Sequence, residues 1–272
     1  MTRRLKLMSG LSTLAAVSAL ALAGCGGEGE AESEAGSSAL SGEAESEGAS
    51  GQAESGEGES EGGALTGDPA TDDVAYIKLL GLVRGHLIAF YELNRAGDPE
   101  MAMMHVKHPE SELYASLAPA FAARRKPGFA DELRALAAAA ANGGDVDGAY
   151  NAAVEAINAH LPKAKPALRL LAVSAMVRVA ADEFDIGVED DGAIVNAHEY
   201  QDAYGFLVAG RDILSGIGGD DADTAEAVAQ AHEQIEAGLA SFDGLTADAT
   251  EGRPSTLYGA AARIEIAGRG LN

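Results

Sequence analysis

The stretch that decides the fold is residues 72–96, DDVAYIKLLGLVRGHLIAFYELNRA. Its large apolar side chains recur every three or four residues, which is the spacing of one face of an α-helix. Leu79, Leu82, Phe90 and Leu93 belong to this apolar stripe, and His86 lies in the middle of it. The stretch therefore predicts a long helix that carries one ionisable side chain into the protein core.

The same spacing continues to the end of the chain, and no segment shows the strict apolar–polar alternation of a β-strand. Breaks rich in Gly, Pro, Asn and Asp separate the periodic segments. About 200 residues follow residue 71, which is the length of one ordinary domain. We therefore expect an all-α bundle of about seven or eight helices. They cover roughly residues 72–96, 109–123, 129–141, 146–161, 166–188, 193–215, 223–241 and 256–267, with a short helical turn over 100–105.

The bundle contains a weak internal repetition. A long segment with His86 is followed by a Gly-Asp break and a second segment with His105 and His108. A long segment with His198 is likewise followed by a Gly-Asp break and a second segment with His232. This pattern suggests two duplicated helical pairs.

The N-terminus has the three parts of a secretory signal peptide: a basic start, a short apolar stretch and small residues before a cleavage site. The apolar stretch is too short and too polar for a comfortable membrane span. It ends in Leu22-Ala23-Gly24-Cys25, and Cys25 is the only cysteine of the chain. This end resembles the lipobox of bacterial lipoproteins. The resemblance implies that residues 1–24 are removed and that Cys25 is lipidated, whereas the alternative is an isolated thiol behind an ordinary signal peptide. It also implies a lipid anchor in the cell envelope, by default at the outer membrane facing the periplasm, because no Asp follows the cysteine.

Residues 25–71 form the second predicted region, an acidic linker before the domain of residues 72–272. Positions 26–63 consist almost entirely of Gly, Glu, Ser and Ala, with eleven glutamates and no Lys, Arg or aromatic residue. Such a composition cannot bury enough apolar surface to fold, so we expect a disordered tether. It serves as a spacer, or as a weak cation collector or surface-export signal.

The charge of the chain excludes one class of partner. The net charge is −24, of which residues 64–272 contribute −16. An acidic domain without a basic stripe is repelled by nucleic acid and by anionic lipid. Membrane contact is therefore expected through the lipid alone.

Several ionisable residues fall on helix faces where apolar residues are expected. A buried carboxylate is costly unless a counter-charge is present, and carboxylates and histidines on facing helices are how bundles build metal sites. We therefore predict a metal site, with iron or copper as the ion. An alternative is that Arg169, Arg178, Arg211 or Arg263 neutralises the carboxylates and that His86 is a hydrogen-bonded core residue. The candidate ligands are His86, Glu183, His198, Glu199 and Asp202.

A second candidate metal site combines thioethers with imidazoles, a mixture that favours copper because soft ligands select Cu(I). The alternative is that the methionines fill gaps in the core and that His105 caps a helix end. The residues of this cluster are Met101, Met103, Met104, His105 and His108.

The segment 199–206, EYQDAYGF, is similar to helical periplasmic segments found beside bacterial iron permeases. The wider arrangement resembles imelysin-like iron-uptake proteins, although no histidine here has the Glu three residues later that the His-x-x-Glu motif of that family requires. Recognisable catalytic motifs are absent from the sequence, so we do not expect an enzyme. The prediction is a metal-binding envelope lipoprotein that works beside a metal-uptake system. The alternative is an interaction or structural lipoprotein without a cofactor.

The lipid anchor leads to the first prediction. Replacing Cys25 by Ser removes the only lipidation site, and with it the acyl chains whose buried methylenes each contribute about 0.8 kcal/mol to membrane binding. The variant should move from the membrane fraction to the soluble envelope fraction. Unchanged fractionation would exclude lipidation of Cys25 as the anchor.

Overall fold

The computed structural model describes residues 67–109, 113–219 and 221–271, so the predicted signal peptide, Cys25 and residues 26–63 of the linker lie outside the described residues. The described part of the chain contains nine α-helices and no strand, which confirms the all-α prediction. Their bounds are α1 Asp73–Ala96, α2 Pro99–His108, α3 Tyr114–Arg124, α4 Ala130–Asn142, α5 Val146–His160, α6 Pro166–Gly187, α7 Ala197–Ser215, α8 Ala222–Leu239 and α9 Pro254–Gly270.

The helix bounds differ most from the predicted ones in three places, and elsewhere by one to three residues. The expected turn over 100–105 is a full helix, α2, and α3 begins at Tyr114 rather than at 109. The start predicted at 193 was also wrong, because α7 begins at Ala197. Gly192 adopts a left-handed conformation with φ of 93°, and Ala193 pairs with Ala249 in an isolated β-bridge. These backbone contacts take residues 193–196 out of the helix.

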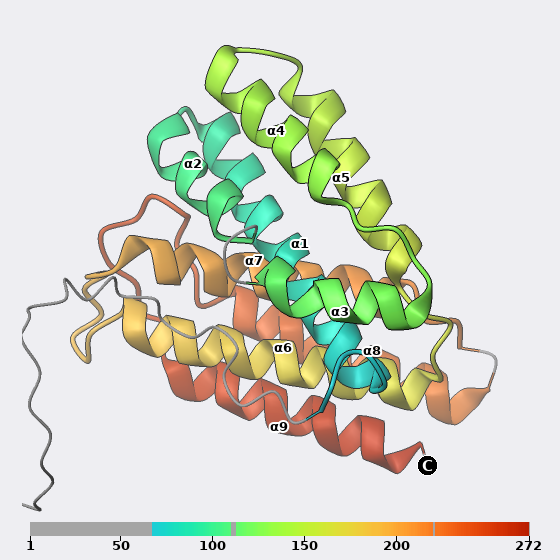
Figure 1. The fold of residues 1–272 in the computed structure, drawn as a ribbon. Coiled ribbons are helices and arrows are strands. Elements are labelled where there is room, and N and C mark those ends of the chain that lie inside the picture. Colours follow the sequence, from blue (N-terminus) through green and yellow to red (C-terminus); the bar gives the residue numbers. More distant parts are fainter. Residues whose placement is uncertain (1–66, 110–112, 220, 272) are drawn as a thin grey trace, which may run out of the picture. The chain divides into compact units, whose positions relative to one another are not determined.

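The last four helices, α6 to α9, form a bundle in which α6 packs against both α7 and α9. Figure 1 shows α6 and α9 side by side. Helix α1 packs against α6 and α7, and α2 folds back onto α1. Helices α4 and α5 form an antiparallel pair, with α4 touching α2 and α5 touching α1. The arrangement makes α1 the element that joins the N-terminal helices to the bundle.

The turn between α1 and α2 uses residue types that suit a tight helical hairpin. Gly97 ends α1 in the left-handed conformation, with φ of 87°, which glycine adopts without steric cost. The Asp98 side chain then accepts a hydrogen bond from the Met101 amide, and Pro99 occupies the first helical position. Because the turn is short, α2 is placed directly against the C-terminal half of α1.

Helix α1 is buried on most of its surface. Its predicted stripe is fully inside, since Leu79, Leu82, His86, Phe90 and Leu93 all have 0% exposure. By length and apolar composition α1 could cross a membrane, but 83% of the relevant window is buried in the protein. That degree of burial fits the central helix of a folded domain.

Helices α1 and α7 touch through their backbones at two glycines. A Cβ atom placed on Gly205 would lie 2.2 Å from the carbonyl oxygen of Gly85, and one placed on Gly85 would lie 2.9 Å from the amide nitrogen of Phe206. No larger residue fits at either position without moving a helix. The contact lies next to His86 and three residues from Asp202, so it fixes the distance between these two side chains.

The duplication of two helical pairs stays a prediction. Helices α1 and α2 pack together, as do α7 and α8. The two pairs nevertheless use their histidines differently, because His105 is fully buried whereas His232 is only partly buried.

The glycine contact leads to a stability prediction. Gly205→Ala should lower the free energy of unfolding by about 1–3 kcal/mol, because overpacking against a backbone atom outweighs the gain in helix propensity. Gly259→Ala in α9 is the matched control, since its Cβ would meet only the flexible end of Arg263. Urea unfolding of both variants tests this. Equal or greater stability of Gly205→Ala would contradict the close backbone contact.

Candidate metal centre

Four of the five predicted primary ligands meet in the core, together with one residue of the secondary candidate cluster. His86 comes from α1, His105 from α2, and His198, Glu199 and Asp202 from the first turns of α7. All five side chains are buried, with exposures between 0% and 7%. They form two triads that share one carboxylate, and the donor atoms within each triad lie within 4.8 Å of one another. The triads are His86–His105–Asp202 and His198–Glu199–Asp202.

The first triad is arranged around one oxygen atom. Asp202 Oδ1 lies 2.7 Å from Nδ1 of His86 and 2.8 Å from Nδ1 of His105. The His86 ring is also held edge-on against Phe206, with ring centroids 5.0 Å apart. Two imidazole nitrogens from two different helices therefore converge on a single carboxylate oxygen.

Gln201 fixes the orientation of His105. The Gln201 side-chain amide donates to the backbone carbonyl of Leu245 at 2.8 Å, which leaves its oxygen to accept from Nε2 of His105, also at 2.8 Å. The proton on Nε2 of His105 is donated to Gln201. The Nδ1 atom that faces Asp202 therefore either carries a second proton, which makes the ring a charged imidazolium, or presents a lone pair. Two lone pairs do not approach at 2.8 Å, so this position requires a cation, either a proton or a metal ion.

The second triad lies on the other oxygen of Asp202. Nδ1 of His198 is 3.5 Å from Asp202 Oδ2 and 3.6 Å from Glu199 Oε1. The His198 ring stacks on the His105 ring, with centroids 4.4 Å apart and planes 15° from parallel. Among the described residues, Asp202 Oδ2 and Glu199 Oε2 are buried without a hydrogen-bond partner. A buried oxygen without a partner lowers the stability of the fold. A metal ion bound to these two oxygens would remove that cost.

The electrostatics of Asp202 favour its charged form. Burial alone would raise its pKa, but the charges of His86 and His105 and their hydrogen bonds outweigh burial and hold the pKa well below its usual range. The carboxylate is therefore ionised in a fully buried place and presents negative charge to the imidazoles.

The four arginines proposed as counter-charges make other contacts. In the described part of the chain, the known contacts of these four arginines are with groups other than His198, Glu199 and Asp202. Arg169 donates to the carbonyls of Ile213 and Gly216, Arg178 contacts Glu265, Arg211 contacts Glu236, and Arg263 contacts Gln234.

The remaining predicted ligands are placed differently. Glu183 is buried on α6, with 4% exposure, but it belongs to neither triad. In the secondary cluster, Met101 and Met103 pack partly buried against the core, and Met104 is 46% exposed. The side chain of His108 lies outside the described residues. Of the members of this cluster whose side chains are described, His105 is the one that the structure brings to the inward carboxylates.

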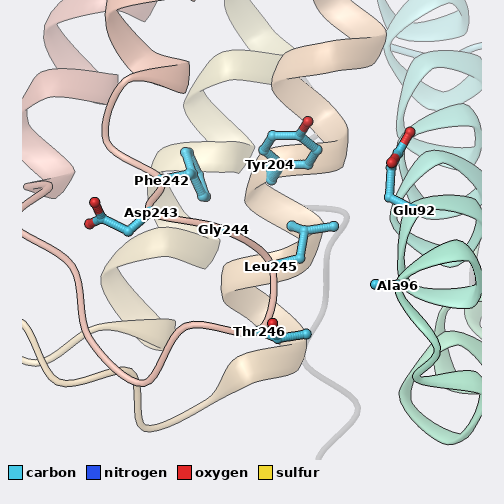
Figure 2. A pocket seen from close by; sticks show the side chains of 8 residues that line it. All are labelled: Glu92, Ala96, Tyr204, Phe242, Asp243, Gly244, Leu245 and Thr246. Carbon is cyan, nitrogen blue, oxygen red and sulfur yellow. The ribbon is translucent and has the colours of Figure 1, made fainter.

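A hollow of about 460 Å³ lies between α1, α7 and the loop that follows α8. Figure 2 shows Glu92 and Ala96 of α1 on one side, facing Tyr204 of α7 and the loop of residues 242–246. Leu245 lines this hollow, and its carbonyl is the one that holds Gln201. Leu245 and Gln201 therefore connect the hollow to His105 through two hydrogen bonds. The hollow also carries two carboxylates, Glu92 and Asp243.

The comparisons with known proteins bear on the second half of the chain. Residues 162–266 match the family model of the iron permease-associated 4-helix bundle domain. The match spans α6 to α9, including the first turns of α7 that carry His198, Glu199 and Asp202, whereas His86 and His105 lie outside it. No curated protein and no solved structure is significantly similar to this chain. The likeness of residues 199–206 to segments beside iron permeases is thereby confirmed at the level of this domain.

The role of Gln201 leads to a prediction. Gln201→Leu removes the acceptor that orients His105, and loss of such an outer partner typically weakens metal binding about 10–100-fold. We expect the affinity for Fe(II), measured by anaerobic calorimetry, to fall about 10–100-fold. The far-UV circular dichroism spectrum should be unchanged. Gln230→Leu, at an exposed position of α8, is the control and should bind as the unmodified chain does. Equal affinities of the two variants for Fe(II) would contradict a role of Gln201 in metal binding.

Proposed function

We propose that this chain is an envelope lipoprotein whose helical domain binds iron and passes it to a membrane permease. The observation that supports this most directly is the carboxylate of Asp202, which is fully buried and ionised and which contacts three histidines from three helices. A carboxylate in this position stabilises a bound cation strongly, because little water competes with it.

The donor set favours iron over Cu(I). Both triads consist of imidazole nitrogens and carboxylate oxygens, and neither includes a thioether. Imidazole and carboxylate ligands suit iron, whereas Cu(I) selects softer sulfur donors. The match of residues 162–266 to a domain associated with iron permeases points to the same metal. Binding and transfer, rather than catalysis, is the role we assign to the site.

The rest of the chain suits delivery at a membrane. A lipid on Cys25 would hold the protein at the envelope membrane, by default the outer membrane facing the periplasm. The acidic linker would let the domain move away from that surface. The charge of −16 on residues 64–272 would attract cations toward the domain without attracting anionic lipid. We propose that the partner is an envelope iron-uptake system.

Iron binding leads to a prediction for a single substitution. Asp202→Asn keeps the shape of the side chain but removes the charge that both triads share, so affinity for Fe(II) should fall by on the order of 100-fold or more, beyond the loss expected for an outer partner. Metal analysis and anaerobic calorimetry of the full mature chain, purified without a histidine tag, measure this.

Asp190→Asn is the matched control. Asp190 is exposed and lies in a separate acidic hollow with Asp185, Glu189 and Asp191. If the acidic surface merely collects cations, both variants should lose binding equally. If neither the unmodified chain nor the control binds iron, copper or zinc, the metal proposal fails and the chain is an interaction lipoprotein without a cofactor.

A further inference from the structure

We propose that the site holds two metal ions, bridged by the carboxylate of Asp202. This inference rests on the proposed function, since it specifies how many ions the same residues bind. The first ion would lie between His86, His105 and Asp202 Oδ1. The second would lie between His198, Glu199 and Asp202 Oδ2.

The two oxygens of Asp202 serve different ligand sets. Oδ1 receives the His86 and His105 nitrogens at 2.7 and 2.8 Å, whereas Oδ2 lies 3.5 Å from the His198 nitrogen. Metal–ligand bonds of about 2.0–2.2 Å require all donors of one ion to lie within roughly 4.4 Å of one another. The donor atoms of each triad lie within 4.8 Å of one another, close to this limit, and Asp202 belongs to both triads.

The buried oxygens point to the second position. Glu199 is 6% exposed and Asp202 is 0% exposed. Among the described residues, Glu199 Oε2 and Asp202 Oδ2 have no hydrogen-bond partner. Both atoms belong to the second triad, so an ion in the first triad alone would leave them without a partner. A second ion would satisfy both atoms.

The positions of the two histidine rings also fit two neighbouring ions. The stacked rings of His105 and His198, 4.4 Å apart, can direct nitrogens to two neighbouring positions. A carboxylate that bridges ions about 3.5–4 Å apart is the common arrangement of two-metal sites.

The stoichiometry of iron binding tests the two-ion site. The full mature chain, titrated with Fe(II) without oxygen and separated from free metal, should retain two ions per chain. Glu199→Gln removes a ligand of the second position only and should retain one ion. Asp190→Asn should retain two. One ion in the unmodified chain would overturn the two-ion site and leave iron binding intact, whereas no ion would overturn both.

A second measurement needs no variant and therefore does not depend on how well Glu199→Gln folds. Cu(II) binds nitrogen and oxygen sites most tightly among the divalent first-row metals, and two Cu(II) ions about 4 Å apart couple magnetically. The electron paramagnetic resonance signal should grow with the first equivalent and then fall or broaden with the second. A signal that grows in proportion through two equivalents, or stops unchanged after one, would contradict a bridged pair.

Discussion

The contact of Gly85 with Gly205 determines the rest of the site. It lets the backbones of α1 and α7 touch, so a Cβ on Gly205 would lie 2.2 Å from a carbonyl oxygen. His86 follows the first glycine directly, and Asp202 precedes the second by almost one helical turn. Their side chains therefore meet at 2.7 Å in a part of the core that excludes water. At a wider helix separation, His86 would lie farther from this carboxylate.

The contact between His86 and Asp202 is buried, so the negative charge of Asp202 must be compensated inside the core. Asp202 stays ionised although it is fully buried, since His86 and His105 lower its pKa more than burial raises it. Gln201 uses one proton of His105 and thereby directs the other ring nitrogen at the carboxylate. The loop that follows α8 takes part as well, because the carbonyl of Leu245 holds Gln201 in place. In the absence of a metal ion, protons on the histidines supply the positive charge beside Asp202. A bound metal ion would supply this charge instead.

Much of this arrangement could be predicted from the sequence, and the reasons for the failures are physical. Periodicity showed that His86 and Asp202 replace apolar residues on inward faces, because a helix repeats regularly. His105 was assigned to a methionine-rich cluster, since its sequence neighbours do not show that the hairpin at Gly97 turns it toward α7. Gln201 was missed because its role depends on a carbonyl 44 residues away. Glu183 has the same inward pattern as Asp202 but lies in neither triad, and only tertiary packing distinguishes the two.

The matched iron permease-associated bundle supplies α7, while α1 and α2 bring two further histidines from outside the match. The iron site that we propose would therefore combine imidazoles and carboxylates from inside and outside the matched residues. X-ray absorption at the iron edge of the loaded full chain tests it most directly. We expect nitrogen and oxygen neighbours at about 2.0–2.2 Å with outer scattering from two or more imidazole rings. A sulfur neighbour, or oxygen neighbours without imidazole scattering, would contradict this account.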